Sequence, residues 1–331
     1  MKALIVTNML PSKERPGWGA FVGSQVQSLR DEGVDIDVIH IRSDVSKWEY
    51  WKAKATVRDH CRAKDYDVIH AHYGLSAAPC LFQTQIPLVI SYCGSDIFGH
   101  TDVDGKTSFK SAVLAAIQRL FGYRAAQVIV KSGEMKEQLP KAVQKKTHIV
   151  PNGVSFDRFH PGDKQAERAR LGLQPDTFYV LFPYDPLRLR KNYRLLEQAI
   201  ETLNSQGHTL APLIMFEKHP DELAHAMRAA DCLALTSYWE GSPNAVKEAM
   251  ASNLPIVATD VGDVRWLVSG VEGTEVSTTE TEDFTTALRR IVERGNRPTT
   301  ARSQMAHLEL GAVARQVIEI YKFSSQKRKK G

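Results

Sequence analysis

The stretch Cys232-Leu-Ala-Leu-Thr-Ser-Tyr-Trp-Glu-Gly-Ser-Pro-Asn-Ala-Val-Lys-Glu-Ala-Met250 decides the fold. It opens with a strand-like apolar run over 232–236, and Pro243 stands where a helix would begin. Proline is favoured at the first helical position because an N–H there has no intrahelical partner, and Ser242 is a natural N-cap before it. The stretch therefore predicts a buried strand, a turn and a helix over 243–252, which form one β–α unit of a parallel sheet.

The turn of this unit favours a phosphorylated ligand. The N–H groups facing outward at such a helix start belong to Gly241, Ser242 and Asn244, and the helix dipole favours an anion there. Glu248 lies roughly 7–8 Å along the helix, about the separation of a diphosphate from its ribose. With Glu240 before the helix for sugar hydroxyls, these groups describe a nucleotide-sugar site. The alternative is an ordinary surface β–α unit whose Glu248 pairs with the neighbouring lysine or with solvent.

The composition is that of a globular protein with room for two domains. The chain has 331 residues, 43% of them hydrophobic and 24% charged. Its four cysteines show no paired close spacing, so neither a zinc site nor a disulfide framework is indicated. The first seven residues read as a buried strand rather than a signal peptide, and no apolar run approaches the ~18 residues of a membrane span. The expected location is therefore the cytoplasm.

The net charge of +5 is unevenly distributed. One basic stretch ends the first half and comprises Lys106, Lys110, Arg119, Arg124, Lys131, Lys136, Lys141, Lys145 and Lys146; another is the tail Lys327-Arg-Lys-Lys330. A solvated face is the common explanation of such charge. The functional one is a surface for a phosphorylated acceptor or for anionic lipid head groups, with peripheral binding to the inner face of the cell membrane. Nucleic acid is not expected, because no binding module accompanies the charge.

Strands and helices alternate along the whole chain, which predicts parallel sheets. In the first half the expected strands are 3–7, 34–41, 67–71, 87–92, 126–131 and 148–150, and the helices are 21–32, 47–63, 108–122 and 135–142. After a turn-rich break at 151–163, strands are expected at 179–183, 211–215, 231–236, 255–258 and 274–276, and helices at 194–206, 220–229, 243–252, 264–269 and 281–293. The predicted fold is α/β: two Rossmann-like, doubly wound domains facing a cleft. The domains are expected at 1–155 and 156–307, with a helix at about 308–325 that can pack back on the first.

The order of these segments resembles the family-4 type of retaining glycosyltransferases, the group 1 enzymes with the two-Rossmann GT-B fold. The resemblance rests on segments 7–12, 16–25, 67–72, 94–97, 151–154, 185–192, 240–248 and 255–263. It implies metal-independent, retaining transfer of a hexosyl unit from a nucleoside-diphosphate sugar to a hydroxyl of a saccharide or lipid-linked acceptor, without a cofactor. Variants with Glu-Gly-Ser-Pro-Asn and a short second domain are most similar to enzymes of bacterial surface-polysaccharide or cell-wall polymer synthesis.

The resemblance assigns roles in the second half of the chain. Glu240 would bind hydroxyls of the donor sugar and Glu248 the ribose. Residues that would wrap the sugar and the diphosphate are Gly241, Ser242, Pro243 and Asn244. Lys191 and one of two arginines, Arg188 or Arg190, would neutralise the departing diphosphate. Arg188 is taken as the catalytic arginine and Arg190 as a substrate-binding one.

In the first half, Gly17 and Gly19 lie in a loop where missing side chains let backbone N–H groups approach a phosphate or an acceptor. The alternative is a surface loop. Gly94 and Ser95 are expected to bind substrate, and Asp96 next to them would orient the acceptor or the sugar. His70 and His72 end a strand at the cleft edge, where they either contact the acceptor or are structural.

One departure from the family concerns Cys93, which stands where many relatives carry histidine. A thiol cannot donate as a cation, so either His70 or His72 takes part of that role, or the sugar is contacted through Tyr92 and backbone. A nucleophilic Cys93 is not expected, since nothing basic is adjacent in sequence. Two other functions fit the same scaffold: a nucleotide-sugar epimerase and a non-catalytic nucleotide-sugar binding protein.

Overall fold

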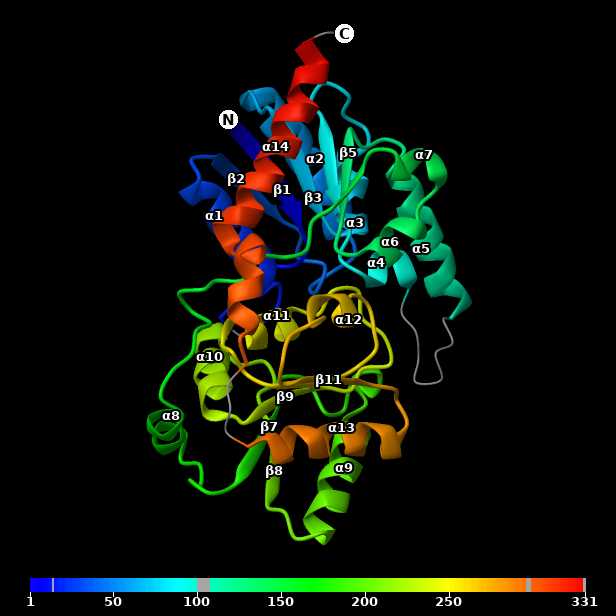
Figure 1. Cartoon of the computed structure of the whole chain (residues 1–331). Coiled ribbons are helices and arrows are strands. Elements are labelled where there is room, and N and C mark those ends of the chain that lie inside the picture. Colours follow the sequence, from blue (N-terminus) through cyan, green and yellow to red (C-terminus); the bar gives the residue numbers. More distant parts are fainter. Residues whose placement is uncertain (14, 100–107, 296–298, 330–331) are drawn as a thin grey trace.

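The computed structural model describes residues 1–13, 15–99, 108–295 and 299–329. It contains two α/β domains, one above the other in Figure 1, each built on a parallel sheet. Two Rossmann-like, doubly wound domains were predicted, and this fold class is confirmed. Within the described residues, no helix combines the length and apolar character that crossing a membrane requires.

The first sheet has six strands in the order β2-β1-β3-β4-β5-β6, and each neighbouring pair is parallel. The strands are β1 (Lys2–Thr7), β2 (Asp35–His40), β3 (Val68–His72), β4 (Leu88–Ser91), β5 (Gln127–Val130) and β6 (Thr147–Ile149). Their near-continuous burial is typical of strands covered on both faces. In register, Thr7 at the end of β1 lies between His40 and His72.

Helices cover both faces of this sheet. One face carries α2 (Glu49–Ala63), α3 (Gly74–Ala77), α4 (Ser95–Phe98), α5 (Phe109–Phe121) and α6 (Gly133–Glu137). The other face carries α1 (Ala20–Asp31) and α14 (Leu310–Lys329). Figure 1 shows α14 rising from the second domain to lie along the first, where Val317 and Tyr321 are buried in its core.

The second sheet has five parallel strands in the order β11-β10-β9-β7-β8. They are β7 (Phe178–Phe182), β8 (Leu210–Ile214), β9 (Cys232–Leu235), β10 (Ile256–Thr259) and β11 (Thr274–Ser277). The helices α9 (Tyr193–Ser205) and α13 (Thr281–Arg294) cover one face. On the other lie α10 (Pro220–Ala229), α11 (Asn244–Ala251) and α12 (Val264–Leu267), with α8 (Lys164–Leu171) at the edge beside α10.

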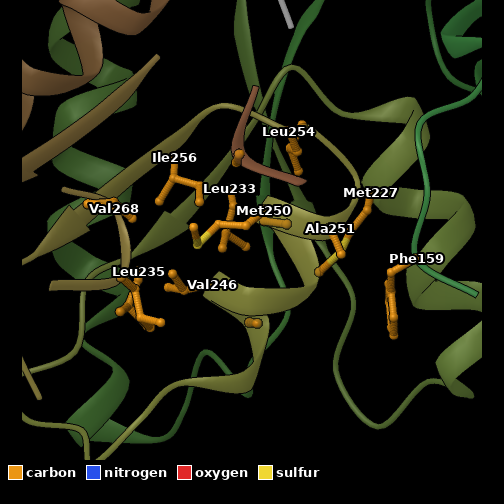
Figure 2. Packing of buried hydrophobic residues seen from close by; sticks show 14 of the residues in the cluster. Phe159, Met227, Leu233, Leu235, Val246, Met250, Ala251, Leu254, Ile256 and Val268 are labelled. Carbon is orange, nitrogen blue, oxygen red and sulfur yellow. The ribbon is translucent and has the colours of Figure 1, made fainter. Parts of the chain in front are cut away.

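The position of α11 is fixed by its apolar side. Figure 2 shows Val246 and Met250, four residues apart and so on one side of the helix, packed toward Leu233, Leu235 and Ile256 of the sheet. Burial of these side chains holds the first turn of α11 at the end of β9. The start of the helix is therefore set by the core rather than by a cap.

Both strand orders reverse direction at one point: between β1 and β3 in the first sheet, and between β7 and β9 in the second. In doubly wound sheets ligands bind outside the carboxyl ends of the strands at this switch point. The loops that follow these strands are therefore the ones expected to carry a site.

The predicted strands all occur, with ends displaced by one residue at most. Two helix predictions were wrong at a proline, and two others, 47–63 and 264–269, were two residues too long. The helix expected over 135–142 is broken at Pro140 into α6 and α7 (Lys141–Gln144), because proline lacks the N–H to continue. The helix expected from Pro243 begins at Asn244, since Pro243 has an extended ψ of 119°, and Ser242 does not cap it.

Helices α3, α4 and α8 were not predicted. Part of the basic stretches lies outside the described residues, namely Lys106, Lys330 and the side chains of Lys327, Arg328 and Lys329.

Candidate active site

A cleft of about 470 Å³ lies between the two domains, within the usual size range of small-ligand sites. Predicted site residues that line it are Gly17, Ser95, Arg188, Arg190, Lys191, Glu240, Gly241, Ser242, Pro243, Asn244 and Glu248, and Cys93 lines it too. Those that do not line it are Gly19, Gly94, Asp96, His70 and His72. The cleft thus joins the predicted donor residues of the second domain to the glycine loop of the first.

A buried charge cluster forms the centre of the second-domain wall. Nζ of Lys191 lies 2.5 Å from Oε1 of Glu240, and Nη1 of Arg190 lies 3.0 Å from Oε2. Ser237 donates a further hydrogen bond to Oε1 at 2.8 Å. Two hydrogen bonds connect the loops after β7 and β9. The Thr236 hydroxyl donates to the carbonyl of Lys191 at 2.7 Å, and the N–H of Tyr238 donates to the carbonyl of Arg190 at 3.0 Å.

Two cations around one carboxylate leave this cluster with excess positive charge. Burial lowers the pKa of Lys191 to about 8, assisted by Arg190 and opposed by Glu240. Burial alone would raise the pKa of Glu240, but Lys191 and Arg190 outweigh it and lower that pKa to about 2. Glu240 is therefore a permanent anion, and Lys191 is a cation that an added anion would stabilise.

The structure distinguishes the two arginines. Arg190 is held by Glu240, donates to the carbonyl of Trp239 at 2.9 Å and stacks on that indole ring at 4.4 Å. Arg188 is exposed, lines the cleft, and its guanidinium forms no ion pair or hydrogen bond with any described residue. Arg188 is consequently the arginine available to an incoming anion, whereas Arg190 positions Glu240.

The start of α11 faces the cleft beside this cluster. The N–H groups of Gly241, Ser242 and Asn244 have no hydrogen-bond partner in the described part of the chain, as the anion-site prediction requires. Such free N–H groups at the positive end of a helix attract a phosphate. The Oδ1 of Asn244 accepts a hydrogen bond at 3.2 Å from Asn152 in the segment joining the domains.

Glu248 is half-buried one turn further along α11. Lys247 does not pair with it: its ammonium group donates to the carbonyl of Asn152 at 3.3 Å and to Ser242 Oγ at 3.2 Å. No described side chain forms an ion pair or hydrogen bond with the Glu248 carboxylate, and burial raises its pKa to about 7. Glu248 can therefore accept hydrogen bonds from a ligand. The pairing of Glu248 with its neighbour Lys247, which was one form of the alternative considered above, does not occur.

Lys247 supports the wall of the cleft from behind, a role that the sequence analysis missed. It is fully buried behind the helix start, and burial lowers its pKa to about 8. Both carboxylate oxygens of nearby Asp263 are buried without a hydrogen-bond partner among the described residues. No pattern in the sequence indicates that a lysine within Asn-Ala-Val-Lys-Glu turns inward.

Glycines occupy positions near the cleft where the backbone passes close to other segments. A Cβ on Gly17 would lie 3.3 Å from the carbonyl of Lys218 in the second domain. Gly19 has a φ of +68° at the start of α1, and a Cβ there would lie 2.5 Å from the backbone of Met9, so the turn itself requires glycine. A Cβ on Gly241 would lie 3.8 Å from Cα of Gly94, so the two domains approach closely there.

Asp96 does not face the cleft. Its carboxylate is fully buried and accepts the backbone N–H groups of Gly74, Cys93 and Gly94 at 2.8–3.1 Å. Burial raises its pKa, while these donors oppose the rise. Asp96 thus shapes the loop that presents Cys93 and Ser95 and has no free oxygen directed at a substrate.

The two histidines are core residues. His70 is hydrogen-bonded to Tyr321 of α14 at 2.5 Å and to Ser91 at 2.7 Å. His72 is fully buried, its ring nitrogens have no described partner, and burial lowers its pKa to about 3. Both are therefore neutral, and neither reaches the cleft to replace the family histidine at Cys93.

Cys93 lines the cleft and is half-buried. Burial, with the nearby Asp96 carboxylate, raises the pKa of its thiol to about 12. Since the thiolate is the reactive form, Cys93 is not an activated nucleophile.

The fold and the cleft together define a class. Two parallel, doubly wound domains face each other across a cleft, as in the GT-B transferases. The second domain supplies a helix start, two carboxylates and the Arg188 guanidinium, which has no partner among the described residues. Two family models match the chain: glycosyltransferase family 4 over residues 45–158 and glycosyl transferases group 1 over residues 191–294, together about two thirds of its length. The chain belongs to the group 1, family 4 glycosyltransferases.

Known relatives agree with this membership. A proposed teichuronic acid biosynthesis glycosyltransferase, TuaC of Bacillus subtilis, is 28% identical over 333 residues, covering 80% of this chain and 82% of TuaC. D-inositol 3-phosphate glycosyltransferase 1 of Catenulispora acidiphila is 27% identical, over 72% of this chain and 67% of that one. The structure of HepE from Anabaena in complex with UDP-glucose superposes with a TM-score of 0.66 at 18% identity and covers both chains fully, which shows a shared fold.

Proposed function

We propose that the protein transfers a hexosyl unit from a nucleoside-diphosphate sugar to an acceptor hydroxyl with retention of anomeric configuration. The observation that carries this proposal is the buried Lys191–Glu240–Arg190 cluster. Beside it lie the Arg188 guanidinium and the N–H groups of the α11 start, which have no partner among the described residues. Glu240 is the anion for sugar hydroxyls, and Glu248 is the acceptor for the ribose.

In this reaction the bond from the anomeric carbon to the diphosphate oxygen breaks, and a bond to the acceptor oxygen forms on the same face. The acceptor proton passes to the departing diphosphate, whose negative charge grows as it leaves. Arg188, Lys191 and the α11 start would neutralise that charge, which is the role a metal ion has in other phosphate sites. We therefore propose a metal-independent transferase without a cofactor.

The donor class is supported by the complex of HepE with UDP-glucose, and the polymer context by the teichuronic acid description of TuaC. We place the reaction in bacterial surface-polysaccharide or cell-wall polymer synthesis, with a saccharide or a lipid-linked sugar as acceptor. The residues of the first-domain wall, among them Gly17 and Ser95, would face that acceptor.

A thermal-shift panel of nucleotide sugars tests the proposal, since a ligand that binds only the folded state raises its melting temperature by mass action. One donor should stabilise the protein and then be consumed slowly without an acceptor, and excess chelator should not change that rate. Interconversion of the sugar without release of nucleoside diphosphate would identify an epimerase. Stabilisation without turnover would identify a binding protein, and a rate abolished by chelator would contradict the role of Lys191 and Arg188.

A further inference from the structure

The outward side of α5 is apolar along its whole length. Phe109, Ile117 and Leu120 are 84%, 45% and 54% exposed, and further exposed apolar side chains on this side are Val113, Leu114 and Tyr123 just past the helix. A helix on the surface of a globular protein normally carries polar and charged groups on this side. Among the described residues, the exposed charges on or next to α5 are Lys110 in its first turn and Arg124, three residues past its end.

Two contacts connect the region of α5 to α2 through Leu81 and Phe82. Nη2 of Arg124 lies 3.5 Å from the carbonyl of Leu81, and the ring of the next residue, Phe82, is capped by Nζ of Lys54 at 3.9 Å. Lys54 lies one turn after Trp51 on α2, which is exposed. The α2–α5 surface is defined by Trp48, Trp51, Lys54, Phe82, Phe109, Lys110, Val113, Leu114, Ile117, Leu120, Tyr123 and Arg124, and both helices lie on one face of the first sheet.

The chemistry of this surface matches a lipid head-group region. Tryptophan, tyrosine and phenylalanine favour the boundary between head groups and acyl chains, and lysine and arginine beside them reach the phosphates. The acids of α2 do not cancel this charge, since Glu49 is paired with Lys52 at 2.7 Å and Asp59 lies beside Arg58. The exposed Lys141 at the start of α7 and Lys145 just after it add positive charge to the same domain, although Glu134 and Glu137 on α6 oppose it.

A second copy of the chain fits the surface less well. Two antiparallel α5 helices would bring Lys110 of one copy toward Arg124 of the other, and α5 has no acidic residue to pair with either. An anionic bilayer satisfies both the apolar centre and the cationic ends.

We propose that the α2–α5 surface docks on an anionic lipid bilayer, with α5 lying in the plane of the head groups. The proposal does not depend on the transfer reaction. It goes beyond the expectation of the sequence analysis, which rested on the charge of the two basic stretches, because it names the apolar side of one helix as the part that enters the head groups.

Vesicle sedimentation of the full chain tests the proposal. The wild-type protein should pellet with phosphatidylglycerol-containing vesicles at low salt, release at high salt, and stay in solution with pure phosphatidylcholine. In the double variant Ile117→Glu/Leu120→Glu, the partition coefficient onto anionic vesicles should fall by roughly tenfold or more, because the strength of membrane binding scales with the buried apolar area. The matched control Trp266→Glu changes an exposed aromatic residue on α12 of the other domain and should bind as wild type.

Three results would overturn the proposal. The first is that the wild-type protein stays in the supernatant with anionic vesicles. The second is that the double variant pellets as the wild type does, while deletion of residues 326–331 abolishes binding. The third is self-association of the wild type without lipid that the double variant loses, which would make the surface an interface between copies. Unchanged thermal unfolding and unchanged stabilisation by a nucleotide sugar would show that the variants remain folded.

Discussion

The ammonium group of Lys191 lies 2.5 Å from Oε1 of Glu240, although 49 residues separate them. They follow β7 and β9, the two strands on either side of the switch point of the second sheet. The cation proposed for the diphosphate and the anion proposed for the sugar are therefore one electrostatic unit. Under the proposed function, a diphosphate that enters the cleft would compete with Glu240 for Lys191.

Replacing Glu240 should separate sugar recognition from diphosphate binding. In Glu240→Gln, Lys191 and Arg190 lose their shared anion and remain free to attract phosphate. We expect turnover of the full donor to fall by roughly 100-fold, the effect of losing one charged contact in the transition state, while nucleoside-diphosphate affinity stays equal or rises. Steady-state kinetics and isothermal titration on the same preparation measure both. A parallel loss of nucleoside-diphosphate affinity would contradict this division of roles.

The ribose contact is expected to depend on Glu248. Because its carboxylate has no described partner, Glu248→Ala should weaken nucleoside-diphosphate binding by about 1.5–3 kcal/mol, the range for hydrogen bonds to a charged group. Glu275→Ala on β11, whose carboxylate pairs with Arg290 at the surface, is a matched control that should leave the affinity unchanged. Isothermal titration compares the two. Equal affinities for the Glu248 variant and the wild type would remove the ribose role.

Donor affinity should depend on pH through Lys191 and Glu248. The pKa of Lys191 is about 8 in the empty cleft, and a bound diphosphate would raise it, so affinity should fall as pH rises above about 8. The pKa of Glu248 is about 7, so affinity should also fall below about pH 7 as its carboxylate is protonated. Titration with an intact nucleotide sugar avoids the ionisation of a terminal phosphate.

Two variants identify the residue that titrates at each end of this pH profile. Lys191→Arg keeps the charge at high pH and should flatten the alkaline limb, whereas Glu248→Gln should flatten the acid limb. An unchanged alkaline limb in Lys191→Arg would assign the titration to another group, and Lys247 is the first candidate because its pKa is also about 8.

The hydrogen bond between Tyr321 and His70 should stabilise the fold without serving the reaction. Tyr321→Phe leaves one nitrogen of a buried imidazole unpaired, and such a loss costs about 1–3 kcal/mol. Denaturant unfolding should show that loss in the free energy of unfolding, with nucleotide affinity and kcat unchanged. A fall in kcat without a loss of stability would indicate that His70 contacts the acceptor, the other role predicted for it.

The strands could be predicted from the sequence because each is a short apolar run between turn residues, and all occur within one residue of the predicted ends. The α11 unit could be predicted for the same reason, although its cap could not. The sequence could not show that Asp96 is turned away from the cleft, or decide between the two alternatives for His70, because their partners, Gly74 and Tyr321, come from distant segments. The choice between Arg188 and Arg190 depends on which guanidinium pairs with Glu240. That pairing is set by how the loops after β7 and β9 pack, and the sequence does not show it.

The most direct test of retaining transfer is the configuration of the sugar released from a bound donor. Proton NMR can follow the protein with that nucleotide sugar in the absence of acceptor, where water takes the place of the acceptor hydroxyl. We predict release of nucleoside diphosphate together with free sugar that first appears in the anomeric configuration of the donor, before mutarotation. First appearance of the opposite anomer, or no release from a donor that binds tightly, would contradict a retaining transferase.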